Sequence, residues 1–172
     1  MRLILLCIIC FALKSCGDSS ETQALGKANN SKIDPINAKR IERLNYTDYV
    51  LSAKAEEKLA DWEKYQELAI QINYLKKADL TFFNGDKGPL KEFISAFKAG
   101  LPEDLKTNPI LSRMAVIETT ILRLNENLTL DNISNDLKLE SIKEVLMSFS
   151  NLNFQVNKKI ARDIYDQIKS DY

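Results

Sequence analysis

Histidine is absent from this chain of 172 residues, and its three cysteines are Cys7, Cys10 and Cys16. Without histidine the chain lacks the commonest general base, the usual base of a catalytic triad and the commonest zinc ligand. Beyond residue 16 no thiol remains to form a disulfide or to bind a transition metal. These absences argue against catalysis, so we expect no enzyme, no catalytic residue and no metal site.

Glycine and proline are scarce as well, with five and four residues. All of them lie outside the long segments in which apolar residues recur every three or four positions. The alternation of apolar and polar residues that is typical of a half-buried strand does not persist for more than a few residues. The sequence therefore predicts an all-α protein.

The amino-terminal residues 1–16, MRLILLCIICFALKSC, are the most informative stretch that is present. Arg2 gives a basic start, and the eleven residues 3–13 that follow carry no charge. An apolar run of this length is typical of a secretory signal, whereas a membrane span needs about 20 residues. We therefore expect the protein to be exported, with residues 1–15 as the signal peptide.

The end of this stretch, Leu13-Lys14-Ser15-Cys16, resembles the lipobox of bacterial lipoproteins, although Lys14 stands where that box prefers a small or aliphatic residue. The resemblance implies cleavage between Ser15 and Cys16, with a diacylglyceryl thioether and an N-acyl chain on Cys16. It also implies attachment to a membrane of the cell envelope, the outer rather than the inner one. The alternative is an ordinary secretory signal cut near residues 19–20. We expect no other cofactor.

After such cleavage 157 residues remain, with 22 Lys and Arg against 24 Asp and Glu. Nucleic-acid-binding proteins usually carry an excess of basic residues, so we expect no nucleic-acid partner. Residues 16–33 are small, polar and without periodicity, which indicates a flexible tether that spans about 55 Å when fully stretched. Residues 34–172 form the expected helical domain.

Apolar periodicity predicts the helices of that domain. We expect an antiparallel bundle of three long helices with coiled-coil-like packing, crossed by short helices. Asp34 and Pro35 look like the N-cap and first residue of the first short helix. Phe93 and Phe97 lie in the second, which Gly100 ends. The long helices are expected at residues 47–78, 109–128 and 139–168, and the short ones at residues 34–44 and 89–100.

Polar and aromatic residues beside the apolar faces are the candidates for contacts. We expect Tyr49 and Tyr74 to lie on the helix face away from Trp62, where exposed aromatic rings can contact a partner. Buried amides and hydroxyls near the apolar seams would fix the register of the packed helices. The residues of this second kind are Arg113, Thr120, Asn153, Gln155 and Asn157.

Three segments of the chain resemble small helical lipoproteins of the Bacteroidetes, flavobacteria in particular. They are residues 61–65 (DWEKY), 109–119 (PILSRMAVIET) and 153–159 (NFQVNKK). This resemblance implies a lipid-anchored envelope protein and carries no activity with it.

Together these observations predict a lipid-anchored envelope protein with a non-catalytic binding or structural role and an envelope protein as its partner. A periplasmic carrier or sensor is the first alternative, with an apolar ligand held between helices near Trp62, Phe93 and Phe97. A hydrolase of envelope polymers is the second alternative, and it would need two carboxylates facing one cleft. The candidate acids are Asp61, Glu63, Glu67, Glu118 and Glu126.

Overall fold

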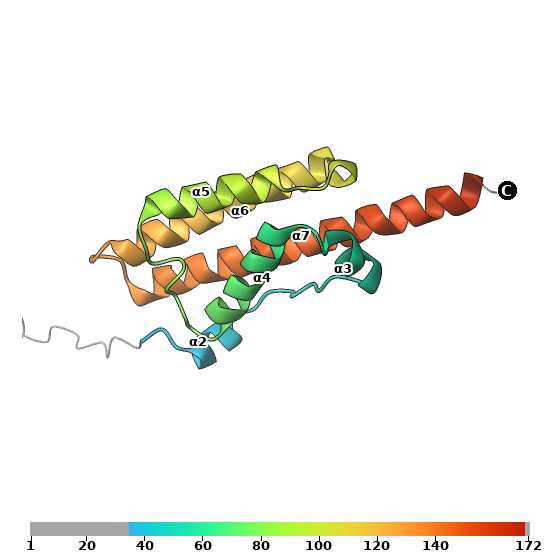
Figure 1. Cartoon of the computed structure of the whole chain (residues 1–172). Helices are drawn as coiled ribbons and strands as arrows, with labels where there is room; N and C mark the ends of the chain where they lie inside the picture. Colours follow the sequence, from blue (N-terminus) through green and yellow to red (C-terminus); the bar gives the residue numbers. More distant parts are fainter. Residues whose placement is uncertain (1–34, 171–172) are drawn as a thin grey trace, which may run out of the picture. The chain divides into compact units, whose positions relative to one another are not determined.

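The computed structural model describes residues 35–170, and every regular element in that range is helical (Figure 1). The predicted all-α class is therefore confirmed for this part of the chain. None of its helices is both long enough and apolar enough to cross a membrane. The elements are α2 (Ala38–Glu42), α3 (Ala53–Leu59), α4 (Glu63–Lys76), α5 (Lys87–Ala99), a short 3₁₀ turn η1 (Glu103–Leu105), α6 (Asn108–Thr129) and α7 (Asn135–Ser170).

The two longest helices, α6 and α7, are antiparallel neighbours (Figure 1). Thr120 of α6 bonds to Ser148 of α7, and Arg123 one turn later bonds to Glu144 one turn earlier. Residue numbers thus rise along α6 as they fall along α7. The long helix predicted for residues 109–128 is confirmed. Its side chains that recur at steps of three and four are buried: Ile110, Met114, Ile117, Ile121 and Leu124.

The carboxyl-terminal part of α7 extends past the start of α6, as Figure 1 shows. Side chains of α7 are buried as far as Val156, and Ile160 is half-buried. Ile164 and Ile168 are exposed, although they lie within the long helix predicted for residues 139–168. The last ten residues of α7, about 15 Å of helix at 1.5 Å per residue, therefore contribute little to the core.

Helix α5 closely follows its prediction. Asp86 caps its start by accepting a bond from the Gly88 N–H at 3.0 Å, and Gly100 ends it. Phe93 and Phe97 are buried, and the indole N–H of Trp62 donates to the carbonyl of Phe97 at 3.0 Å. This contact ties α5 to the start of α4.

The single long helix predicted for residues 47–78 is wrong, so only two of the three expected long helices are present in residues 35–170. Residues 45–51 lie outside any helix, and α3 and α4 are separate helices that meet at Trp62. Gln66 of α4 donates its side-chain amide to the carbonyl of Leu59, the last residue of α3. The break is therefore held by specific contacts, with α4 starting at the turn that brings Trp62 to α5.

The first short helix also differs from its prediction. It is confined to α2, and its N-cap is Asn37, whose side-chain oxygen accepts from the Arg40 N–H at 3.0 Å. Asp34, the predicted cap, lies outside the described residues. An asparagine four residues before the apolar Ile41 satisfies the same orphan backbone donors as an aspartate would.

Candidate functional site

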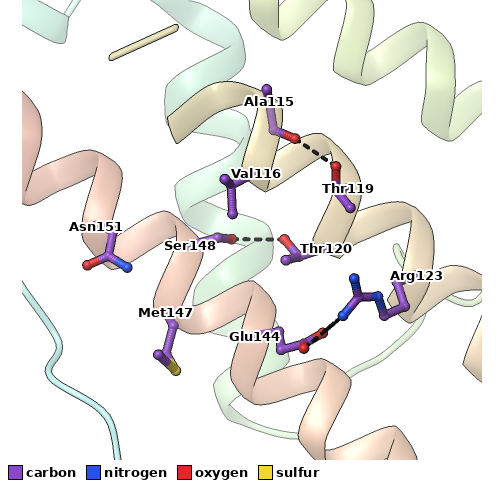
Figure 2. Close-up of a pocket in the computed structure, with 9 residues that line it drawn as sticks. All are labelled: Ala115, Val116, Thr119, Thr120, Arg123, Glu144, Met147, Ser148 and Asn151. Carbon is purple, nitrogen blue, oxygen red and sulfur yellow. Dashed lines mark hydrogen bonds and ion pairs between the residues drawn. The ribbon is translucent and has the colours of Figure 1, made fainter. Parts of the chain in front are cut away.

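The middle of α7 borders two hollows, which make it the best candidate for a binding surface. The first, the α6–α7 groove, has a volume of about 460 Å³ and lies between these two helices (Figure 2). The side chains that line it are Ala115, Val116, Thr119, Thr120 and Arg123 from α6, and Glu144, Met147, Ser148 and Asn151 from α7.

The α6–α7 groove is apolar at its walls. Val116 and Met147, which both line the groove, are 44% and 38% exposed. Small side chains, Ala115 and Thr119, lie beside Val116 and keep the groove open. A wall of this kind favours an apolar contact surface over a polar one.

Four polar side chains of the groove are bonded in two pairs, Thr120 with Ser148 and Arg123 with Glu144. The hydroxyls of Thr120 and Ser148 are 3.0 Å apart, and each also reaches a carbonyl of its own helix, that of Ile117 or Val145. Two hydroxyl hydrogens thus serve three contacts, so one hydroxyl donates to the other while the second donates to a carbonyl. These buried hydroxyls are satisfied without a ligand.

An ion pair closes one end of the groove. Nη1 of Arg123 lies 2.8 Å from both carboxylate oxygens of Glu144, as Figure 2 shows. Both side chains are partly exposed, so the pair contributes about 0–1 kcal/mol to stability. Its role is to define where the apolar part of the groove ends.

The second hollow, the strap cleft, has a volume of about 620 Å³ and lies on another side of α7. One wall is an extended segment, residues 47–52, which we call the strap; α3, α4 and α7 supply the rest. An ion pair between Asp48 and Lys76 joins the strap to α4. Tyr49 and Val50 of the strap face this cleft together with Tyr65 and Asn153.

A buried hydrogen-bonded pair forms the base of the strap cleft. The hydroxyl of Tyr65 donates to Oδ1 of Asn153 at 2.7 Å, and the Asn153 amide nitrogen donates to the Tyr49 carbonyl at 3.0 Å. Burial, together with the negative charge of Glu56, raises the pKa of Tyr65 above its ordinary value of 10.0. Tyr65 is therefore a hydrogen-bond donor throughout the neutral pH range.

The strap is fastened to α7 by three polar side chains, Ser150, Asn153 and Asn157, which we call the α7 ladder. The Ser150 hydroxyl accepts from the Tyr49 N–H and donates to the Thr47 carbonyl, both at 2.7 Å. Asn157 accepts from the Ser52 N–H at 2.9 Å and donates to the Val50 carbonyl at 2.8 Å. The spacing of three and four residues places the ladder on one face of α7.

The predicted contact residues are only partly where the sequence placed them. Tyr49 belongs to the strap and packs against Phe154 of α7, with ring centroids 4.6 Å apart. The expectation that Tyr49 and Tyr74 share a helix face is therefore wrong. Tyr74 is 47% exposed on α4 and lines neither hollow. Ser15 and Cys16, the predicted cleavage and lipidation residues, lie outside the described residues.

The predicted seam residues divide into three groups. Thr120 is buried at the base of the α6–α7 groove. Asn157 holds the strap, and Asn153 bonds both to the strap and to Tyr65 of the neighbouring helix α4. Gln155 is half-buried, and Arg113 is exposed. Ser150 was not predicted, although its spacing from Asn153 and Asn157 indicates one polar helix face.

The structure also shows where the residues named for the two alternative functions lie, the carrier of an apolar ligand and the hydrolase with paired carboxylates. Trp62 and Phe97 are stacked, with ring centroids 4.8 Å apart, and Phe93 packs edge-on against Phe82. Among the candidate acids, Glu67 pairs with Lys64 and Glu118 pairs with Lys98, and the others are exposed: Asp61, Glu63 and Glu126. Within residues 35–170 no group of three or more acidic side chains could hold a metal ion.

No family model, curated protein or solved structure matches this chain. The candidate site is therefore assigned from its geometry alone. That geometry comprises an apolar groove with satisfied polar groups on one side of α7, and a backbone-binding ladder beside the strap cleft.

Proposed function

We propose that this chain is a lipid-anchored protein of the bacterial cell envelope with a non-catalytic binding role, and that its partner contacts the α6–α7 groove. The signal-like residues 1–15, the lipobox-like Cys16 and the polar residues 16–33 motivate the envelope location. The resemblance of three segments to flavobacterial lipoproteins is in keeping with it.

The α6–α7 groove is the single observation that supports the binding role best. Val116 and Met147 present apolar surface to solvent, while Thr120, Ser148, Arg123 and Glu144 are bonded among themselves. A groove between two antiparallel helices is where a third helix lies in a bundle. We therefore assign the occupant as an amphipathic helix of an envelope protein, which would complete a bundle of three long helices with α6 and α7.

Metabolic labelling with a radioactive fatty acid tests the envelope location. We expect label on the wild-type chain, none on the C16A variant, and recovery of the wild-type chain with the membrane fraction. A C16A chain that still takes up label, or a wild-type chain recovered from the cell interior with an unmodified amino terminus, would contradict the anchor.

Photo-crosslinking tests the groove. A photo-reactive amino acid at Val116 or Met147 should join the chain to one discrete envelope protein, and the additional substitution T119R should abolish the product by filling the groove. Ile70 on α4 is the matched control position, because it is 52% exposed and lies outside the groove. Equal crosslinking from residues 70 and 116, or a product that T119R leaves intact, would contradict the groove as the contact.

A further inference from the structure

The α7 ladder recognises backbone atoms of the strap and no strap side chain. Its hydrogen bonds reach the carbonyls of Thr47, Tyr49 and Val50 and the N–H groups of Tyr49 and Ser52. Carbonyls and N–H groups of this kind are present in almost any extended peptide. The ladder is thus chemically suited to extended polypeptide in general.

The strap itself buries little of its surface. Val50 is 75% exposed, Thr47, Asp48, Tyr49 and Ser52 are exposed too, and only Leu51 is half-buried. Each neutral hydrogen bond contributes about 0.5–1.5 kcal/mol net, since water competes for the same groups. A segment held mainly by such bonds opens locally at lower cost than the helices, whose apolar side chains are buried.

The ladder does not depend on the strap for its own arrangement. Its three residues lie on the continuous helix α7, and the Tyr65 hydroxyl holds Asn153 in place from α4. Beside the ladder, the strap cleft of about 620 Å³ leaves room for side chains larger than those of the strap. The exposed ring of Phe154, on which Tyr49 packs, supplies an aromatic contact next to it.

We propose that Ser150, Asn153 and Asn157 form a binding site for an extended peptide, which the chain's own strap occupies in the absence of a partner. The preferred peptide carries an aromatic residue in the place of Tyr49, against Phe154, and an aliphatic residue two positions later, in the place of Leu51. Backbone bonds supply affinity and the two side-chain positions supply selectivity, as in other modes of extended-peptide recognition. This site is separate from the α6–α7 groove and does not require the lipid anchor.

The intramolecular strap competes at an effective concentration in the millimolar range, so a free peptide binds the wild-type chain weakly. The Y49P variant weakens the strap and leaves the ladder intact, because it removes the N–H that donates to Ser150 and the ring that packs on Phe154. We expect a labelled peptide with the sequence of residues 45–52 to bind the full-length Y49P chain at least about tenfold more tightly than the wild-type chain. The additional substitution N157L should abolish this binding.

Backbone N-methylation of the peptide provides the matched controls. Methylation at the positions of Tyr49 or Ser52 removes a ladder donor and should weaken binding about five- to tenfold, which corresponds to one hydrogen bond. Methylation at the position of Val50 leaves both of those donors in place and should have a smaller effect. Equal binding of all three peptides, or no binding to a folded Y49P chain at millimolar concentration, would overturn the proposal.

A measurement on the wild-type chain covers the case in which Y49P does not fold. Excess peptide should accelerate amide hydrogen exchange at Tyr49 and Ser52 and leave the amides of α6 unchanged. Unchanged exchange at both strap positions would overturn the proposal.

Mixing wild-type and Y49P chains identifies the source of the peptide. A mixed dimer would show that the strap of a second copy fills the vacant ladder. Monomers that bind the free peptide would instead assign the site to a segment of another protein. Both results support a backbone-binding ladder, whereas a Y49P chain that binds neither a second copy nor the free peptide would overturn it.

Discussion

Gly100 lies directly against the indole ring of Trp62. A Cβ atom on residue 100 would be 3.0 Å from Cδ1 and 3.1 Å from Nε1 of that ring. The same ring is buried, stacks on Phe97 and donates to the Phe97 carbonyl. Glycine is therefore required at residue 100 for space, since its φ of −78° is open to any amino acid.

The G100A variant should be less stable than the wild-type chain by about 1–3 kcal/mol, the usual range for overpacking a core. The added methyl would displace the indole and lengthen its bond to Phe97. Urea unfolding monitored by fluorescence measures this directly, because Trp62 is the chain's only tryptophan. The control is G85A, since a Cβ at Gly85 meets nothing within 4 Å. If G100A and G85A unfold at the same urea concentration, the steric argument is wrong.

Helix α4 ends in a Schellman motif with alanine where glycine is preferred. Ala78 has a φ of 65°, and the Asp79 N–H donates to the Tyr74 carbonyl at 3.0 Å. A side chain in this left-handed conformation costs about 1–2 kcal/mol, which exceeds the loss of one half-buried methyl. We expect A78G to raise the free energy of unfolding by about 0.5–1 kcal/mol and A78V to lower it. Thermal unfolding of both variants checks the sign, and a destabilised A78G would refute this account.

Stability should fall in alkaline solution because of Tyr65. Burial and the Glu56 charge raise the Tyr65 pKa in the folded chain, whereas the unfolded value is 10.0. Folding thus favours the protonated hydroxyl. Its contribution to the free energy of unfolding is complete below pH 10 and is lost as the pH rises above 10. Y65F should be less stable at pH 8, because Asn153 loses its donor, but should lose less further stability between pH 10 and 11.5. Urea unfolding between pH 10 and 11.5 measures how the free energy of unfolding changes with pH for the wild-type chain and for Y65F. Equal changes in the two proteins would exclude Tyr65 as the cause.

Asn125 of α6 fixes the loop before α5. Its buried amide group donates to the carbonyls of Phe83 and Gly85, both at 2.9 Å. N125D would place a carboxylate against two carbonyl oxygens, and we expect a loss of about 3 kcal/mol or more at pH 7. The loss should shrink as the pH falls from 7 towards about 4, the unfolded value, because burial raises the pKa of the new carboxyl in the folded chain and the protonated carboxyl can donate one bond.

Asn127 offers the matched control for N125D. It donates to the hydroxyl of Ser141 at 2.6 Å, and that hydroxyl can turn and donate to a carboxylate instead. N127D should therefore change the free energy of unfolding by less than about 1 kcal/mol. If urea unfolding at pH 7 gives a similar loss of unfolding free energy for N125D and N127D, the contact of Asn125 with two carbonyls is not the cause of the loss.

Periodicity predicted α6 and α7 because each helix buries one continuous apolar face. Helix α6 packs mainly against α7 and to a lesser extent against α5, and the steps of three and four from Ile110 to Leu124 correspond to its buried face. The predicted end of α5 at Gly100 is confirmed as well, whereas the helix starts two residues before the predicted residue 89. Predictions of this kind depend only on neighbours in the sequence.

The division between α3 and α4 had no such local signal. Ala55, Leu59, Trp62 and Tyr65 keep helical spacing across the break and are all buried. The contacts that favour the break come from distant residues, above all the Phe97 carbonyl. The same holds for the strap, whose bonds come from side chains about one hundred residues later in the chain. A single sequence does not show such pairings. Asn153 and Asn157 were therefore predicted only as polar residues near an apolar seam, and the strap that they bind was not predicted.

The position of the strap in the chain relates its attachment to the length of the link between the helical core and the membrane. The strap is the last segment before the helices that form most of the core, and residues 16–33 are the expected link to the membrane. Releasing the strap alone would not lengthen that link, because α2 lies before the strap in the chain and packs against α4 and α7 with Ile41 buried. Detaching α2 as well would add the eighteen residues 35–52 to the link, about 60 Å when extended. The burial of Ile41 and the ladder would then together set how far an anchored body reaches from the lipid surface.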